Sequence, residues 1–228
     1  MNRFAFEPAA VPSVAIAGSE QRFPVHRIYC VGRNYAEHVL EMGGLPERDP
    51  PFFFSKPADA VVANGAAVPY PPRTANLHHE IELVVAIGRG GRAIAAANAL
   101  EHVFGFAVGN DFTRRDLQAA AREGGKPWDT AKGFDSSAAI SAIHTGKRGQ
   151  APSGRIWLAV NGTVRQDSEL SRMTWSVPEI IAELSTFFEL KPGDLIYTGT
   201  PSGVGPLKPG DRIEGGIEGL DELRNTIA

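Results

Sequence analysis

The chain has 228 residues, of which 43% are hydrophobic and 21% are charged. These fractions are ordinary for a soluble globular protein, and the length suits one large domain or two small ones. With 23 basic and 26 acidic side chains the formal net charge is −3, and no basic cluster is interleaved with aromatic residues. This pattern argues against a nucleic-acid-binding protein and against a protein that binds membrane surfaces.

The cysteine content and the N-terminal segment bear on location. Cys30 is the only cysteine, so an intrachain disulfide is excluded and a cytoplasmic protein is expected. Glu7 and two prolines interrupt the first residues, which therefore do not read as a secretory signal. No stretch approaches the roughly 18 uninterrupted apolar residues that a membrane helix needs. We expect residues 1–25 to form an N-terminal extension and residues 26–228 to form one compact domain.

Glycine and proline divide the chain into many short elements, which predicts a β-rich α+β fold with few helices. The 25 glycines and 17 prolines are spread along the chain rather than gathered in one tract. The sequence "VNGTVRQ" at 160–166 places Asn-Gly between two extended runs, a strong hairpin signal. Strands are expected at 27–31, 52–54, 60–63, 80–87, 104–110, 155–161, 195–198 and 211–214.

Three helices are expected, at 34–42, 113–123 and 177–189. The first begins at Asn34, a candidate N-cap, and stops before two glycines. The second begins at Thr113 with Asp116 three residues on, which is similar to a capping box. The third has Pro178 in its first turn and apolar residues at helical spacing, and we assign it a packing role.

Two carboxylates stand two residues apart in the strand-like stretch "LHHEIELVV" at 77–85. Side chains of a strand alternate between faces, so Glu80 and Glu82 project from one face while His79 projects from the other. One interpretation is an exposed edge strand whose glutamates face water. The other is a divalent cation site, which would cancel their repulsion. Asp111, at the end of another apolar strand, is a candidate third ligand, although a turn or capping role fits it equally.

Other polar residues carry chemistry only in combination. His38 and Glu41 are three residues apart on the first expected helix, so the carboxylate is within reach of the imidazole and would raise its basicity. A solvated helix face is the alternative. Lys56, Lys132 and Arg115 are candidate anchors for a substrate carboxylate.

Taken together, these segments resemble the fumarylacetoacetate hydrolase family, in its single-domain branch of acylpyruvate hydrolases and oxaloacetate decarboxylases. The resemblance runs in the family's order from about residue 26 to the C-terminus. It rests on "CVGRNYAEHVLEMG" (30–43), "FFFSKPADAVV" (52–62), "NLHHEIELVVAIG" (76–88), "GNDFTRRDLQ" (109–118), "GKPWDTAKGFD" (125–135), "LAVNGTVRQ" (158–166) and "GDLIYTGTPSGVGPLKPGD" (193–211).

The resemblance implies a mixed β-sheet roll, a homodimer, and a catalytic domain over 26–228. It implies that Glu80, Glu82 and Asp111 bind Mg²⁺ or Mn²⁺, and that His38 and Glu41 form a water-activating dyad. It further implies Lys132 as the active-site lysine. The positions that it places around the substrate are Arg33, Lys56, Arg115, Gln118 and Thr200.

The implied reaction is metal-dependent hydrolysis of a carbon–carbon bond in a 2,4-diketo acid, such as fumarylpyruvate to fumarate and pyruvate. The same site would also suit oxaloacetate decarboxylation, isomerisation of a 2-oxo diacid or, on the same scaffold, non-catalytic binding of a metal or anion. Two departures from the family pattern stand out. The sequence before Asp111 is "GN" where relatives often have a hydrophobic residue, and the expected final strand is hard to see in "EGGIEGLDELRNTIA".

Overall fold

The computed structural model describes residues 4–45, 49–145 and 150–228. In these ranges the chain forms two larger sheets, a small three-stranded sheet and a two-stranded hairpin. The expected β-rich α+β fold is confirmed. Within the described residues no helix combines the length and the apolar character needed to cross a bilayer.

A seven-stranded mixed sheet forms the centre of the described structure. β3 pairs in parallel with β14 and β11 pairs in parallel with β5, whereas the other neighbours are antiparallel. In spatial order its strands are β4 (Phe52–Lys56), β3 (Arg27–Gly32), β14 (Asp194–Tyr197), β8 (Ile81–Ile87), β9 (Val103–Asp111), β11 (Ala138–Ile140) and β5 (Val61–Ala63).

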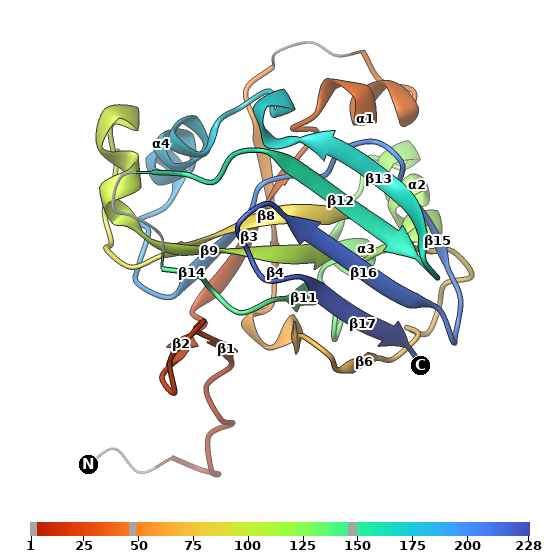
Figure 1. The fold of residues 1–228 in the computed structure, drawn as a ribbon, viewed down its shortest axis with the longest axis horizontal. Coiled ribbons are helices and arrows are strands. Elements are labelled where there is room, and N and C mark those ends of the chain that lie inside the picture. The colour runs from red at the N-terminus through yellow and green to blue at the C-terminus, as the bar shows by residue number, and fades with distance from the viewer. Residues whose placement is uncertain (1–3, 46–48, 146–149) are drawn as a thin grey trace.

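A five-stranded sheet lies against it, so that β12, β16 and β17 stand in front of β8 and β9 in Figure 1. Its hairpin turn is Asn161-Gly162, where both residues have positive φ (51° and 78°), as expected from the sequence. In spatial order its strands are β13 (Thr163–Glu169), β12 (Arg155–Val160), β16 (Arg212–Ile217), β17 (Leu223–Ile227) and β6 (Ala67–Val68).

The core follows from strand alternation. All seven residues of β8 are buried, because both faces of this central strand are covered. Leu83 and Val85 pack between the two large sheets, whereas Val84 and Ala86 pack on the opposite face. Glu82 therefore belongs to the opposite face as well.

The C-terminal strand that was hard to see in the sequence is present as β17. It pairs antiparallel with β16 and parallel with β6. Leu223, Asn225 and Ile227 are its buried residues. The polar Asn225 obscured the alternation, and its amide donates to the backbone oxygens of Ala63 and Ala66.

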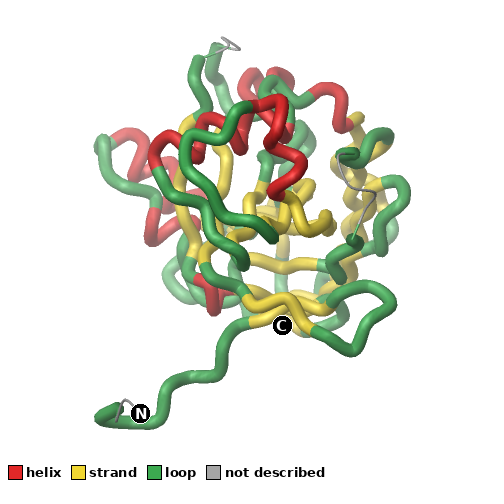
Figure 2. The backbone as a smooth tube through the Cα atoms, turned by 90° about the vertical axis from the view of Figure 1, so that its left-hand side faces the viewer, coloured by secondary structure: helices red, strands yellow, loops and turns green. Residues whose placement is uncertain are grey.

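The helices surround the sheets, mostly on the side away from the N-terminus (Figure 2). α1 and α2 lie close together at one end of the sheets in Figure 1. The α-helices are α1 (Ala36–Glu41), α2 (Arg115–Glu123), α3 (Asp129–Lys132) and α4 (Val177–Phe187), and the 3₁₀ turns are η1 (Ala58–Ala60), η2 (Ala96–His102) and η3 (Leu170–Arg172).

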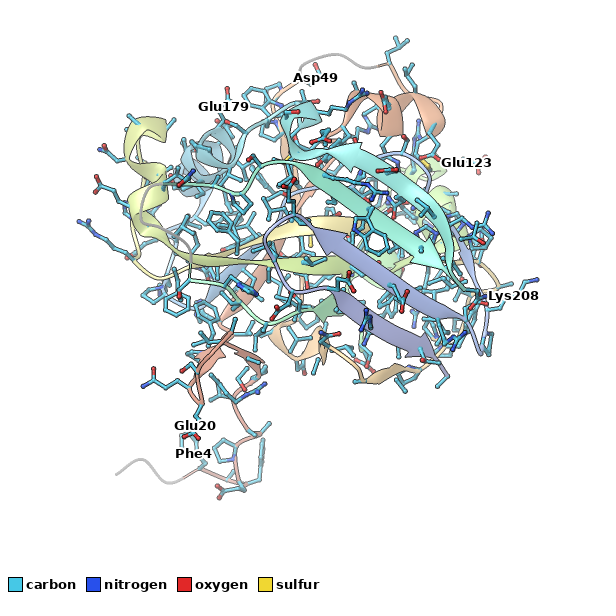
Figure 3. The ribbon with its side chains drawn as sticks, viewed as in Figure 1. Phe4, Glu20, Asp49, Glu123, Glu179 and Lys208 are labelled. Atoms are coloured by element: carbon cyan, nitrogen blue, oxygen red, sulfur yellow. The ribbon has the colours of Figure 1, made fainter. Side chains whose placement is uncertain are left out.

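The N-terminal segment contains a hairpin that the sequence did not suggest. β1 (Ser13–Ala15) pairs antiparallel with β2 (Arg22–Pro24), and Val14 and Phe23 are buried in the core on the outer face of the seven-stranded sheet. Phe4 lies beyond this hairpin and away from the body of the molecule (Figure 3). The boundary between residues 25 and 26 stays a prediction.

Two expected helix caps were wrong. The N-cap of α1 is Tyr35, not Asn34, whose side-chain amide donates to the backbone oxygens of Trp175 and Thr198. The N-cap of α2 is Arg114, because residues 113–114 form the short strand β10 (Thr113–Arg114). Asp116 caps no helix with Thr113 and instead binds the hydroxyl of Thr74 at 2.6 Å.

Candidate active site

A cavity of about 440 Å³ opens beside α1 and α2. It brings together residues that are far apart in the sequence. The predicted site residues that line it are Arg33, His38, Glu80, Glu82, Asp111, Arg115, Gln118, Lys132 and Thr200.

The three carboxylates meet at a break between strands. Glu80 stands between β7 (Leu77–His79) and β8, which belong to different sheets, so the continuous strand expected over 80–87 begins one residue late. The Glu80 backbone is held by Asn110, whose Oδ1 accepts from its N–H at 2.8 Å, and by Asp111, whose N–H donates to its oxygen at 2.8 Å. One carboxylate oxygen from each of Glu80, Glu82 and Asp111 lies within 4.8 Å of the others.

Buried cations neutralise two of these carboxylates. Lys132 Nζ lies 2.6 Å from Glu80 Oε2 and 2.8 Å from Asp111 Oδ2, and Arg115 forms an ion pair with the other oxygen of Glu80. Burial favours the neutral acid of Glu80, but the charges of Lys132 and Arg115 outweigh it and lower the pKa of Glu80. Likewise burial opposes the charge of Lys132, yet Asp111 and Glu80 raise its pKa. Glu80 is therefore held as a carboxylate and Lys132 as an ammonium.

Glu82 has a different environment. Its Oε2 accepts from the Gly199 N–H at 2.8 Å, and it has no ion-pair partner among the described residues. Burial, followed by the charges of Asp111 and Glu80, raises the pKa of Glu82 well above its usual range. The backbone of Gly199 requires glycine here, since its φ is +97° and a Cβ would lie 2.7 Å from the Cβ of Asn34.

This donor set fits a divalent metal ion. Asp111 Oδ1 lies 2.8 Å from Lys56 Nζ, but it has no hydrogen-bond donor among the described residues. The ligand oxygens of Glu80, Glu82 and Asp111 lie close together, and Glu82 has no cationic partner among the described residues. All-oxygen sites of this kind suit Mg²⁺ or Mn²⁺.

His38 and Glu41 form the expected pair on α1. His38 Nδ1 lies 3.0 Å from Glu41 Oε2, and Glu41 Oε1 accepts from the Gly203 N–H at 2.9 Å. Burial opposes ionisation of Glu41, but the hydrogen bonds from His38 and Gly203 prevail and lower its pKa. In the neutral tautomer whose Nδ1–H donates to Glu41, Nε2 of His38 is the nitrogen that can accept a proton. His38 lines the cavity, and Glu41 lies behind it.

Lys56 and the two neighbouring histidines differ in how they lie relative to the three carboxylates. Lys56 is buried behind Asp111, where it also donates to Phe112 O, and it is not among the residues that line the cavity. His79 points away from the carboxylates, as expected, and donates from Nδ1 to Gln166 Oε1 at 2.9 Å. His78 instead lies beside Arg115, with 3.4 Å between His78 Nδ1 and Arg115 Nε.

Several lining residues were not anticipated as such. Phe54 and Trp128 form an aromatic wall with ring centroids 5.8 Å apart. Arg122 also lines the cavity. A signal for it existed in the sequence, because Arg122 follows Arg115 by seven residues and Gln118 by four, which places all three on one face of a helix.

Known proteins match this chain closely. Residues 27–228 match the family model described as "Fumarylacetoacetate (FAA) hydrolase C-terminal". A fumarylpyruvate hydrolase from a Ralstonia species is 47% identical over 77% of this chain and 92% of its own. The mitochondrial oxaloacetate tautomerase of Mus musculus is 45% identical over 88% of this chain and 90% of its own.

A solved structure adds a ligand complex. The fumarylpyruvate hydrolase of Pseudomonas aeruginosa, in complex with Mn²⁺ and pyruvate, superposes with a TM-score of 0.96. It is 52% identical, and the match covers 99% of each chain. The implied β-sheet roll and the enzyme class, a hydrolase acting on carbon–carbon bonds, are confirmed. The chain belongs to the fumarylacetoacetate hydrolase family.

Proposed function

We propose that this protein is a metal-dependent acylpyruvate hydrolase whose substrate is fumarylpyruvate, which it cleaves to fumarate and pyruvate. The observation that carries the proposal is the carboxylate triad of Glu80, Glu82 and Asp111 in the same cavity as the His38–Glu41 pair. Pyruvate, the expected product, is the molecule bound with Mn²⁺ in the Pseudomonas aeruginosa relative.

The water-activating step falls to His38. Its Nε2 takes a proton from a water molecule in the cavity. That water attacks the carbonyl of the acyl group, which is remote from the carboxylate at the pyruvate end of the substrate. Glu41 holds the imidazole in the required tautomer and stabilises the imidazolium that forms. Because Gly203 N–H fixes the other oxygen of Glu41, the pair is oriented before substrate arrives.

The carboxylate triad, through the metal ion that it would hold, and Lys132 act on the leaving group, because they would stabilise its developing negative charge. Glu80, Glu82 and Asp111 would hold Mg²⁺ or Mn²⁺, which as a Lewis acid supplies stabilisation of the negative charge that develops when the carbon–carbon bond breaks. Lys132 is held as an ammonium at the same wall and adds positive charge near the substrate oxygens. Gln118 and Thr200 place polar groups on the wall of the same cavity.

The test is a panel of fumarylpyruvate, acetylpyruvate and oxaloacetate, assayed with Mg²⁺ or Mn²⁺ and with EDTA. We expect loss of the diketo-acid absorbance with metal and no loss with EDTA. His38→Ala is expected to lower kcat on the diketo acids by about 10²- to 10⁴-fold, the range that general base catalysis supplies. Wild-type protein that binds metal but turns over no diketo acid would instead be a binding protein.

A second candidate follows from the mouse relative, an oxaloacetate tautomerase. Tautomerisation or decarboxylation of oxaloacetate needs enolate stabilisation but no hydrolytic water. Activity on oxaloacetate that exceeds activity on fumarylpyruvate and survives in His38→Ala would favour this candidate.

Three further expectations stand beside the proposed activity. We propose a homodimer, as the family resemblance implies, and a cytoplasmic protein, as the single cysteine suggests. We also propose that residues 26–228 form the catalytic domain. The mass of the protein in solution, measured by light scattering after size exclusion, tests the first of these.

A further inference from the structure

Two arginines in the cavity wall have no acidic partner among the residues that the structure describes. Arg115 and Lys132 also line the cavity, but the carboxylates of the metal-binding triad neutralise them. Arg33 and Arg122, in contrast, form no ion pair with any described residue. Arginine is the side chain best suited to bind a carboxylate through paired N–H groups.

Arg122 is far from the triad along α2. Arg115 touches Glu80 and so marks the metal end of this helix. Arg122 lies seven residues further, on the same face, which is about 10 Å along the helix axis. Among the described residues its guanidinium donates from Nη1 to the backbone oxygen of Met42 at 3.2 Å, which leaves most of its five N–H donors available. Figure 3 labels the next residue, Glu123, beside α1 and α2 at the rim of the molecule.

Arg33 lines the cavity with a left-handed backbone conformation and with its guanidinium over the Phe52 ring. Its φ of 60° is left-handed, a conformation that costs a non-glycine residue energy and points to a role for the side chain. Its guanidinium lies 5.8 Å from the centroid of Phe52, and the Phe52 ring in turn occupies the space beside Gly32 that a Cβ would need. Trp128 supports the same ring at 5.2 Å between centroids.

We infer that Arg33 and Arg122 bind the carboxylate at the far end of the substrate and select diketo diacids over diketo acids with an uncharged end. This inference rests on the proposed function, since it assumes that the other end of the substrate lies at the triad. A fumarylpyruvate-like molecule presents a second carboxylate at its acyl end, whereas acetylpyruvate presents a methyl group there. Two arginines that form no ion pair with a described residue, of which Arg122 lies about 10 Å along α2 from Arg115, fit the first molecule and gain nothing from the second.

The experiment compares kcat/KM on fumarylpyruvate and on acetylpyruvate for wild type, Arg33→Gln, Arg122→Gln and Arg122→Lys. For each glutamine variant we expect kcat/KM on fumarylpyruvate to fall by about 10- to 100-fold, the range of one charge-assisted hydrogen bond. On acetylpyruvate the fall should be no larger than that of the control variant Arg172→Gln, which also loses a contact to α1, and Arg122→Lys should recover part of the loss on fumarylpyruvate. Inhibition by fumarate should weaken in parallel, while inhibition by pyruvate should not change.

Arg172→Gln is the matched control. Arg172 also fastens α1, through an ion pair with Glu37, but it does not line the cavity. Its substitution should leave the ratio between the two substrates unchanged. An equal loss on both substrates in Arg122→Gln would mean that Arg122 only positions α1 through Met42, and would overturn the inference.

The same data separate this inference from the proposed function. Wild-type protein that hydrolyses acetylpyruvate and fumarylpyruvate equally well would overturn the diacid selection and leave acylpyruvate hydrolysis standing. Wild-type protein that hydrolyses neither would overturn both.

Discussion

The charged residues of the cavity differ in their ion-pair and hydrogen-bond partners. Glu80 has two buried cationic partners, whereas Glu82 has one hydrogen bond from Gly199 and no ion-pair partner in the described ranges. Lys132 joins Glu80 to Asp111 and is only 2% exposed. Since a buried charge that loses its partner is costly, these residues are expected to respond differently to substitution.

Replacing Lys132 tests whether it neutralises the triad. In Lys132→Met, Glu80 and Asp111 lose their shared cation, so the metal-free protein should lose about 3 to 5 kcal/mol of unfolding free energy. Added Mg²⁺ should restore part of that loss, and the rise in Tm on adding metal should exceed that of wild type. Lys208→Met is the control, because Lys208 lies at the exposed edge of the molecule (Figure 3). Equal Tm values for Lys132→Met and wild type in EDTA would contradict this prediction.

Glutamine substitutions separate the two glutamates. Glu82→Gln retains an oxygen for the Gly199 N–H and removes no ion pair, so the stability in EDTA should change by less than about 1 kcal/mol. Its affinity for Mn²⁺ should nevertheless fall by at least about 100-fold. Glu80→Gln leaves Lys132 and Arg115 without this partner and should cost about 3 kcal/mol even in EDTA. Thermal unfolding and calorimetric Mn²⁺ titration measure the two effects, and equal behaviour of both variants would refute the distinction.

At the scale of elements, α1 is the part whose position depends on few contacts. It has six residues and no side-chain N-cap. Among the described residues, the contacts that hold α1 include the hydrogen bond from Gly203 to Glu41, the ion pair between Arg172 and Glu37 and the hydrogen bond from Arg122 to Met42. A helix this short is not stable by itself, so these contacts determine where His38 lies.

The pH dependence of α1 follows from Glu41. Its lowered pKa means that its hydrogen bonds stabilise the fold fully above the ordinary glutamate pKa and are lost as the pH falls through the lowered value. The difference in Tm between wild type and Glu41→Gln should therefore be present at pH 6 and 7 and should shrink below about pH 4.5. All other titrating groups are the same in the two proteins, so their effects on Tm cancel in the difference. A Tm difference that stays constant down to pH 3 would contradict the prediction.

The extent of prediction from sequence also differs between elements. Strand alternation placed Glu80 and Glu82 on one side and His79 on the other, and the Asn161-Gly162 turn was identified from its dipeptide. The caps failed because Asn34 and Asp116 satisfy partners far away in the sequence, which local patterns do not reveal. Lys56 was expected at the substrate, yet its position behind Asp111 depends on how β4 packs against α3, a tertiary feature.

At the scale of the whole molecule, a fully bonded amide links the five-stranded sheet to the segment that carries Glu80. Gln166 of β13 accepts at Oε1 from His79 Nδ1 and from the Ile81 N–H. Its Nε2 donates to Thr200 Oγ1 and to the backbone oxygen of Pro201. Gln166 is completely buried and lies outside the cavity lining, so its contribution to the site is indirect.

Gln166→Leu should therefore weaken both the fold and the metal site. It leaves several buried polar groups without partners, each costing about 1 to 3 kcal/mol, so the unfolding free energy should fall by at least about 3 kcal/mol. Mn²⁺ affinity should fall although no ligand changes. Gln21→Leu, at an exposed position, is the control for the substitution itself. Unchanged Mn²⁺ affinity in Gln166→Leu would show that the hairpin and the site are independent.

The Gln166 amide also couples the metal site to local opening of the β12–β13 hairpin, although this hairpin contributes no metal ligand. Lifting β12 and β13 off the molecule breaks the four hydrogen bonds of Gln166, and two of them hold the residues on either side of Glu80. Opening of the hairpin and binding of the cation are therefore coupled, and by reciprocity each must oppose the other to the same degree. Binding a cation should slow amide hydrogen exchange along β13, at a distance from the ligands, while exchange at the N-terminal hairpin keeps its rate.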